Sequence, residues 1–330
     1  MVSTPRRIVA LIAAALAATT VVSACSSDSG SSDNAGSGST TLIVGDQVKQ
    51  TQSLLEASGE LKDLPYKITW AAFESGPPLL EAASAGKIDV GGTGDVPPVF
   101  AQAGGAKVKI VGVQQRTKAN DFLLVPAGSS AKSIADLKGK RIGVAKGSSS
   151  HGLLLGLLAQ AGLKPTDVKA TFLQPSEALS AFTAGQLDAW AVWNPFATVA
   201  RTQAKAQVIA DGTEVTTGQS YTLASDTALG NAAKKKAIAD YLARLGRAQK
   251  WAVDHASQWV PTYSKLTKLS QPVAEATFAT TQGQLVPIGT TQIDKHQKLI
   301  DLFYNGGQLP TAPKAADVFD NEFNTSVSTS

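Results

Sequence analysis

Short apolar runs alternate with amphipathic stretches along the first third of the chain. The apolar runs have the length of buried strands and lie at Leu42–Val44, Ile68–Trp70, Ile88–Val90, Val108–Val113 and Phe122–Val125. The stretches between them repeat apolar residues at helical spacing, at Ser53–Gly59, Pro77–Ala85 and Pro97–Ala103. This alternation predicts an α/β fold in which mainly parallel strands are buried on both faces.

A second series of the same kind predicts a second lobe. Its strands are expected at Arg141–Ala145, Ala170–Leu173, Ala189–Val192 and Gln207–Ala210, with helices at Ser150–Ala161, Pro175–Ala184 and Pro195–Gln203. The chain then returns through a strand at Tyr221–Ala224 to helices at Asn231–Ala256, Pro272–Thr280 and Thr291–Tyr304. With crossovers near Val125–Gly128 and Gln219–Ser225, we expect one lobe from residues 42–126 with 222–323 and another from residues 127–221. This arrangement resembles the two-lobed type II periplasmic-binding-protein fold, with a ligand cleft between the lobes.

The stretch from Ser84 to Gly105 is the most informative part of the chain. It predicts a strand at Ile88–Val90, a tight glycine turn and a helix that starts near Asp95. Thr93 and Asp95 are good N-cap residues, and two prolines follow in the first helical turn. Free N–H groups and hydroxyls at such a helix start suit an oxyanion, although a plain capped strand–helix junction explains the same residues.

A related pattern recurs about one domain further along. The segment Ala85–Asp89 (AGKID) is matched by Ala184–Asp188 (AGQLD), and each copy follows an apolar helix and leads into a short strand and a proline-started helix. Two such units predict two lobes, each with a strand end and a helix start at one edge. Ligands of open α/β sheets bind at these edges, so two lobes that face each other would form a cleft.

The N-terminal residues are typical of an exported lipoprotein. Arg6 and Arg7 precede an apolar run of signal-peptide length, which predicts a signal peptide over residues 1–24. Val22–Cys25 resembles a bacterial lipobox, which implies lipid attachment to Cys25 at the extracytoplasmic face of the cell membrane. An ordinary secretory signal or a buried thiol are the alternatives. The Ser/Gly-rich residues 25–41 are expected to be a flexible tether.

Charge and composition remove several classes of function. The chain carries 30 basic and 26 acidic residues, and removal of Arg6 and Arg7 leaves 28 basic residues and a net charge of +2. The run Lys234–Lys236 is better explained as a solvated helix face than as a nucleic-acid site. The sequence has no metal-spaced His/Cys cluster, no G-x-S-x-G elbow and no Walker loop, so we expect no metal, no cofactor and no catalysis.

Five segments in register resemble the aliphatic sulfonate-binding proteins of bacterial ABC importers, a group that also includes taurine- and nitrate-binding relatives. The segments are Phe73–Leu80 (FESGPPLL), Gly91–Gly105 (GGTGDVPPVFAQAGG), Lys146–Leu155 (KGSSSHGLLL), Asp188–Phe196 (DAWAVWNPF) and Leu302–Tyr304 (LFY). They span nearly the whole chain that follows the tether. The resemblance implies a monomeric, lipid-anchored receptor that delivers an organosulfonate to a membrane permease and its ATPase.

The expected binding residues lie at the starts of helices in both lobes. The first lobe offers hydroxyls and N–H groups at Ser75, Gly76, Thr93, Gly94 and Asp95, and the second lobe at Ser148, Ser149 and His151. Trp190 and Trp193 point to opposite faces of one strand, so one belongs to the core and Trp193 is expected to line the cleft. Further expected contacts are Gln47, Asn194, Gln219, Ser220 and Tyr221. Capping alone would also explain the serines, and core packing the tryptophans.

Three departures from the family pattern bear on the charge of the ligand. Asn194 replaces the aspartate of a Trp-Asp-Pro motif, Asp46 stands where an aromatic residue is common, and Thr280–Pro287 lacks an arginine that relatives often carry near Thr281. A lost cation and an added carboxylate leave room for a zwitterion such as taurine or for a larger, less charged molecule. Nitrate and a thiamine-precursor pyrimidine are alternative ligands, and an enzyme or a sensory module on the same fold is the alternative class.

Overall fold

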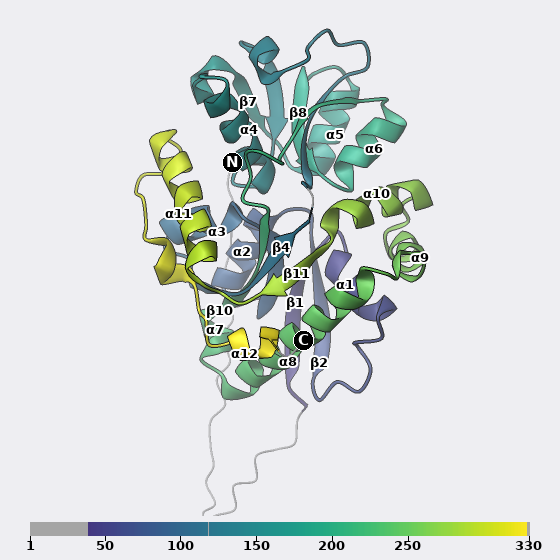
Figure 1. Cartoon of the computed structure of the whole chain (residues 1–330), viewed down its shortest axis with the longest axis vertical. Helices are drawn as coiled ribbons and strands as arrows, with labels where there is room; N and C mark the ends of the chain where they lie inside the picture. Colours follow the sequence, from purple (N-terminus) through teal and green to yellow (C-terminus); the bar gives the residue numbers. More distant parts are fainter. Residues whose placement is uncertain (1–38, 118, 329–330) are drawn as a thin grey trace, which may run out of the picture. The chain divides into compact units, whose positions relative to one another are not determined.

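The computed structural model describes residues 39–117 and 119–328, which form two lobes, each built on one β-sheet (Figure 1). The signal peptide, Cys25 and residues 26–38 of the expected tether lie outside the described residues. Among the residues described, no helix combines the length and the apolar character that a membrane span requires.

The sheet of the first lobe has six strands in the order β11-β4-β10-β3-β1-β2. Their bounds are Thr41–Gln47 (β1), Lys67–Phe73 (β2), Val90–Gly94 (β3), Val108–Arg116 (β4), Gln219–Ser225 (β10) and Gly283–Val286 (β11). Strand β1 is parallel to β2 and β3, whereas β10 is antiparallel to both β3 and β4, and β11 is antiparallel to β4. The carboxyl ends of β1, β3 and β4 therefore meet at one edge.

Helices cover both faces of this sheet. They are Gln50–Ala57 (α1), Gly76–Ser84 (α2), Pro97–Ala103 (α3), Asp226–Leu229 (α7), Ala232–Ala252 (α8), Ala256–Thr267 (α9), Gln271–Thr281 (α10), Thr290–Asn305 (α11) and Asn324–Ser328 (α12). Helix α8 buries Ile238, Tyr241, Leu242 and Leu245, the spacing of one helical face, against Leu42 and other residues of the sheet. Residues of α2 pack with Ile88 and Ile110 in a separate cluster.

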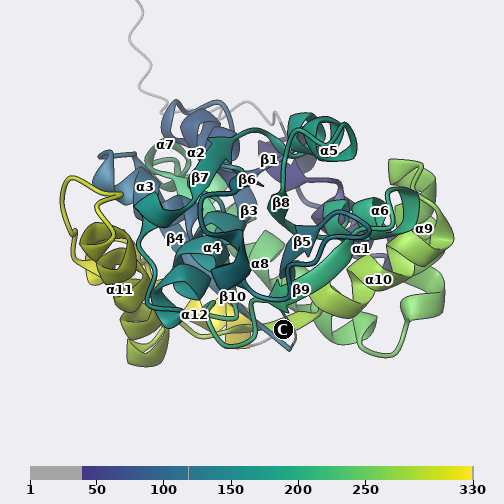
Figure 2. The same cartoon turned by 90° about the horizontal axis from the view of Figure 1, so that it is seen from above.

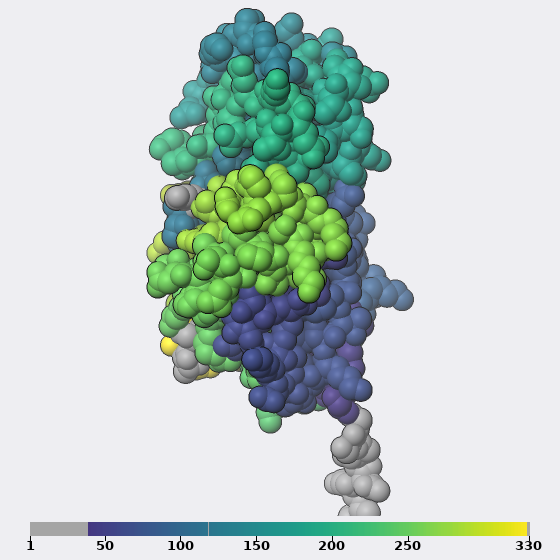
Figure 3. All heavy atoms as spheres, turned by 90° about the vertical axis from the view of Figure 1, so that its right-hand side faces the viewer, coloured from purple at the N-terminus to yellow at the C-terminus, as the bar shows by residue number. Residues whose placement is uncertain are grey.

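The sheet of the second lobe has five strands in the order β7-β6-β8-β5-β9. The strands are Asp121–Val125 (β5), Arg141–Val144 (β6), Lys169–Phe172 (β7), Ala189–Trp193 (β8) and Gln207–Asp211 (β9), and the helices are Ser149–Gln160 (α4), Pro175–Thr183 (α5) and Phe196–Gln203 (α6). Helix α4 packs on one face, whereas α5 and α6 pack on the other, as Figure 2 shows. Figure 3 shows the yellow-green surface around α10 against the teal second lobe, where Asn194 Nδ2 donates to Thr280 Oγ1 at 3.0 Å.

The expected lobe boundaries are wrong by one strand at the first crossover. Strand β5 pairs with β8 and β9, so the chain changes lobe within residues 117–120 rather than near Val125–Gly128. The return falls within residues 212–218, and all of β10 lies in the first sheet. The apolar run of β5 shows that the strand is buried, but not in which sheet. Both sheets are also mixed rather than mainly parallel: β10 is inserted antiparallel between β3 and β4 in the first, and β5 runs antiparallel to β8 and β9 in the second.

The expected glycine turn after Ile88–Val90 is instead part of strand β3. Gly91, Gly92 and Gly94 are extended, and Gly91 is needed for close packing: a Cβ there would stand 2.9 Å from the carbonyl oxygen of Gly45 on β1. The helix that follows begins at Pro97 with Val96 at its N-cap, so Thr93 and Asp95 do not cap it.

The AGKID/AGQLD repeat has the same structural role in both lobes. Asp89 Oδ2 accepts a hydrogen bond from the N–H of Ile43 at 2.8 Å, and Asp188 Oδ2 accepts one from the N–H of Arg141, also at 2.8 Å. Each carboxylate thereby fixes a neighbouring strand, β1 in the first lobe and β6 in the second, to the strand that follows the repeat. Asp89 also pairs with Lys234 and is almost fully buried, whereas Asp188 pairs with a half-exposed arginine.

The two carboxylates should therefore contribute unequally to stability. Asp89→Ala leaves a buried N–H and a lysine without an acceptor, so we expect a loss of about 2–3 kcal/mol in the free energy of unfolding. Asp188→Ala removes a solvated ion pair and should cost about 1 kcal/mol. Urea unfolding of both variants measures the difference; equal losses would contradict the assigned roles.

Candidate functional site

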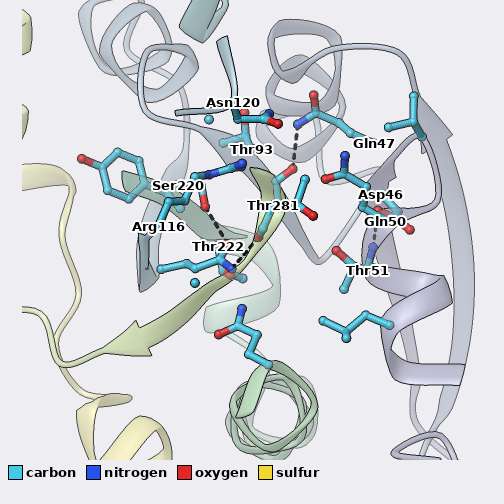
Figure 4. A pocket seen from close by; sticks show the side chains of 18 of the residues that line it. Asp46, Gln47, Gln50, Thr51, Thr93, Arg116, Asn120, Ser220, Thr222 and Thr281 are labelled. Atoms are coloured by element: carbon cyan, nitrogen blue, oxygen red, sulfur yellow. Dashed lines mark hydrogen bonds between the residues drawn. The ribbon is translucent and has the colours of Figure 1, made fainter. Parts of the chain in front are cut away.

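A cavity of about 140 Å³ lies where the strand ends of the first lobe face the start of α4 and the end of β8 (Figure 4). The first-lobe wall comes from the ends of β1, β3, β4 and β10 and from α1, α8 and α10. The second lobe contributes the N-cap and first residue of α4, and the last residue of β8. The cavity is thus lined by both lobes at the expected edge.

Nine of the expected binding residues line this cavity: Gln47, Gly76, Thr93, Gly94, Ser148, Ser149, Trp193, Ser220 and Tyr221. Thr93 has a buried hydroxyl without a hydrogen-bond partner among the described residues. A Cβ at Gly76 would collide with that hydroxyl and with Pro97, so only glycine brings the start of α2 this close to β3. Of the first three residues of α2 only Gly76 has a backbone N–H, because two prolines follow it, and Ser75 does not cap this N–H with its side chain.

Four expected residues lie behind the wall instead: Ser75, Asp95, His151 and Asn194. Ser75 Oγ donates to Gln174 Oε1 at 2.8 Å, and Asp95 accepts from the N–H and hydroxyl of Thr217. Asn194 Oδ1 accepts from the N–H and hydroxyl of Thr198. Their side chains therefore serve contacts between protein segments, because their polar atoms are already paired within the fold. Gln219 is also buried outside the wall, where its Oε1 accepts from the Tyr221 hydroxyl.

His151 is part of an aromatic core rather than the cavity wall. Its ring stacks on Phe100 and meets the edge of Phe303, and Nδ1 accepts from the N–H of Gly147. Burial lowers the pKa of His151 to about 4, and the nearby charge of Lys146 adds to this effect. The imidazole is therefore neutral at physiological pH and holds the loop that leads into α4.

The two tryptophans of β8 are divided between core and cavity. Trp190 is fully buried and packs on Phe182 with ring centroids 5.9 Å apart. Trp193 lines the cavity, and its ring is held edge-on by Phe196. An indole wall of this kind suits an apolar ligand tail.

Several wall residues were not expected from the sequence. They are Gln50, Thr51, Gln114, Arg116, Asn120, Tyr241, Gln249, Trp259, Phe278 and Thr281. Gln114 and Arg116 follow the expected strand Val108–Val113, so the rule that ligands bind at strand ends points to them. The aromatic residues of α8, α9 and α10 lie on helices whose sequence carries no such signal.

Arg116 corrects the expectation that the site has lost its cation. It lies on β4 directly opposite Gly283 on β11, next to the segment that lacks an arginine. Burial lowers the pKa of Arg116, and the charges of Asp121 and Asp95 oppose that effect. A guanidinium keeps its proton in proteins, so the wall carries a positive charge from a neighbouring strand.

Buried carboxylates surround the cavity. Asp46 lies in the wall and accepts from the N–H groups of Thr51 and Gln52 at 3.1 and 2.8 Å, at the start of α1. Burial raises the pKa of Asp46 to about 6 despite these hydrogen bonds. Burial also raises the pKa of Asp95 to about 6 and the pKa of Asp121, which accepts from Ser149 and Ser150.

Together the fold and the cavity define a two-lobed solute-binding protein. The sequence matches the family described as NMT1/THI5 like over residues 75–258. A protein of Escherichia coli (strain K12) named "Putative aliphatic sulfonates-binding protein" is 37% identical over 281 residues, which cover 84% of this chain and 87% of that protein.

Two solved structures agree with these sequence matches. The alkanesulfonate-binding protein SsuA from Xanthomonas axonopodis pv. citri, bound to MOPS, is 34% identical and has a TM-score of 0.78, over 85% of this chain and 98% of that one. The periplasmic aliphatic sulphonate binding protein SsuA from Escherichia coli is 34% identical and has a TM-score of 0.73, over 85% and 92% of the chains. The chain therefore belongs to the NMT1/THI5-like family, and the resemblance stated from its motifs is confirmed.

The raised pKa of Asp46 gives a test of the wall's electrostatics. Between about pH 4 and pH 6 folded Asp46 binds more protons than the unfolded chain, so its contribution to stability is lost as the pH rises. The net shift of about two units corresponds to about 3 kcal/mol, part of which the variant loses because an asparagine side chain has only one oxygen for the two N–H donors. We expect Asp46→Asn to stabilise the protein by about 1–2 kcal/mol at pH 7.5 and by much less at pH 4.5.

Asp188→Asn is the matched control in the same urea unfolding experiment. Hydrogen bonds from Arg141 lower the pKa of Asp188, so its contribution is present at neutral pH and is lost as the pH falls. The two variants should therefore have opposite signs at pH 7.5. If Asp46→Asn lowers the free energy of unfolding equally at both pH values, burial of the ionised carboxylate does not destabilise the folded protein.

Proposed function

We infer that this protein captures an organosulfonate of the alkanesulfonate kind outside the cytoplasm and delivers it to an ABC permease. One observation supports this most: the cavity joins an unpartnered buried hydroxyl, the starts of two helices and an indole wall in one space. Neutral donors at helix starts stabilise oxyanion oxygens, and the indole suits an alkyl tail. The relatives' names give the same class of ligand.

The membrane anchor and the binding role without catalysis belong to the same proposal. A lipid on Cys25, joined through the Ser/Gly-rich tether, would keep the receptor near its permease. Among the described residues there is no group of three or more His, Cys, Asp or Glu side chains that could hold a metal ion. The proposed receptor acts as a monomer.

A zwitterionic sulfonate such as taurine is the second candidate. Asp46 and Arg116 both line the cavity, and Figure 4 shows them on opposite sides of it. A carboxylate on one side and a guanidinium on the other would suit a ligand that carries an ammonium group as well as a sulfonate. The pH dependence of binding separates the candidates, because ionised Asp46 repels a plain anion and attracts an ammonium.

A ligand panel tests the proposal directly. Thermal unfolding and calorimetric titration should be run with ethane-, butane- and octanesulfonate, taurine, nitrate and an aminopyrimidine. At a ligand concentration of 100 times the Kd, binding adds about 2.7 kcal/mol of stability, which raises the Tm by about 4–5 °C for a folded chain of this length. A shift with nitrate or the pyrimidine but with no sulfonate would overturn the assignment.

A further inference from the structure

Arg116 is a buried cation whose hydrogen-bonding capacity is not used within the fold. Its Nη1 atom is inaccessible to solvent and has no partner among the described residues. A buried donor without an acceptor costs about 1–3 kcal/mol, and a charged one costs more. Such a group is retained where a ligand supplies the missing acceptor.

The position of Arg116 places this donor in the ligand cavity. Within the described chain it is the one basic residue of a wall that otherwise carries neutral donors and Asp46. Its backbone N–H donates to the carbonyl of Gly218 at 2.8 Å, which fixes the end of β4 beside β10. The side chain lines this cavity and also borders a second one.

The unpartnered hydroxyl of Thr93 lies on the same sheet edge as Arg116. Strand β3 pairs with β10, and β10 pairs with β4, so two strand spacings separate the two residues. Through Tyr221, Thr93 is level with Val113, so Arg116 lies three residues further along as well. The separation is about 14 Å between backbones, which a long arginine side chain, a threonine and one oxyanion can bridge. Ser220 lies on the strand between them and also lines the cavity.

The surroundings keep the guanidinium charged without using its donors. Asp121 and Asp95 interact with it electrostatically, but both already accept hydrogen bonds from hydroxyl groups of Ser149, Ser150 and Thr217. Their charges offset part of the desolvation cost of Arg116, while the N–H donors of its planar guanidinium remain available to a ligand. A fork of this kind matches two oxygens of a sulfonate.

We propose that Arg116 holds the anionic headgroup of the ligand, with Nη1 donating to one of its oxygens while Thr93 donates to another. This inference rests on the proposed function, because it assigns the sulfonate end of the ligand within that cavity. It makes β4, rather than the segment Thr280–Pro287, the source of the site's positive charge. The tail then extends toward Trp193 and the aromatic residues of α9 and α10.

The test compares Arg116→Gln and Arg116→Lys with the unchanged protein by calorimetric titration of butanesulfonate and of the neutral butanesulfonamide. Loss of a charged hydrogen bond should weaken butanesulfonate binding by about 10- to 100-fold in Arg116→Gln. Arg116→Lys should recover only part, because an ammonium lacks the planar fork. The affinity for the sulfonamide should fall by less, by about tenfold at most, because its neutral oxygens can accept from the guanidinium but add no attraction between opposite charges.

Lys298→Gln is the matched control, because it removes the same charge from a separate cavity that Lys298 and Arg116 both line. It should leave the affinity for butanesulfonate within about twofold, as expected for a solvent-screened charge. Urea unfolding shows whether each variant is folded. If Arg116→Gln does not fold, the affinity of Arg116→Lys for butanesulfonate serves as the test instead.

The outcomes separate this inference from the proposed function. If the unchanged protein binds no sulfonate, the proposed function fails. If it binds butanesulfonate and the folded Arg116 variants bind it equally well, Arg116 only balances Asp121 and Asp95, and the inference is overturned while the proposed function stands. An equal loss of affinity for sulfonate and sulfonamide would likewise show a structural role.

Discussion

The contact between the end of β3 and the start of α4 is the constraint on which the cavity depends. A Cβ on Gly94 would stand 3.0 Å from Cβ of Ser149, so the two lobes meet here at the closest distance that a glycine allows. Asp121 holds the other side of the contact by accepting from the hydroxyls of Ser149 and Ser150 at 2.7 Å each. Because of this contact, Thr93 and Ser148 line one space. A residue larger than glycine at position 94 would therefore have to push the Ser149 side chain back.

Electrostatics give the same space its chemical character. Asp46, Asp95 and Asp121 are buried, and burial raises the pKa of each. Arg116 partly balances them; its side chain lines the cavity, and its buried Nη1 has no partner among the described residues. The wall therefore combines neutral donors with one guanidinium, and the carboxylates limit how much negative charge a ligand can bring. This balance explains why an organosulfonate with a single charge, or a zwitterion, suits the site better than a multivalent anion.

The sequence predicted much of the fold because its signals were local. Proline-started helices, short apolar strands and the AGKID/AGQLD repeat each depend on neighbouring residues, and the structure contains them with shifts of a few residues at their ends. The sheet to which β5 belongs depends on pairing with β8 and β9, which no local pattern records. A local pattern is also insufficient at Gly91. The sequence predicts a turn there, whereas the structure places this glycine inside a strand, where it permits close packing.

The residues of the candidate site also fall into two groups: those that a local pattern predicts, and those whose contacts only the folded structure decides. Residues at strand ends and helix starts, such as Thr93 and Ser148, follow from a general rule about α/β edges. His151 and Asn194 belong to the same motifs, yet their side chains point into packing contacts that only the folded structure decides. Arg116 follows the strand expected at Val108–Val113, so the same rule points to it, but only the folded structure shows that its guanidinium is buried without a partner.

We propose above all that both lobes bind a sulfonate headgroup in this cavity through neutral donors and one guanidinium. A crystal structure of the protein with butanesulfonate tests it most directly. We expect sulfonate oxygens within about 3 Å of Thr93 Oγ1 and Arg116 Nη1, with the alkyl tail against Trp193. A sulfonate bound outside this cavity, or bound inside it with the tail toward Arg116, would contradict the claim.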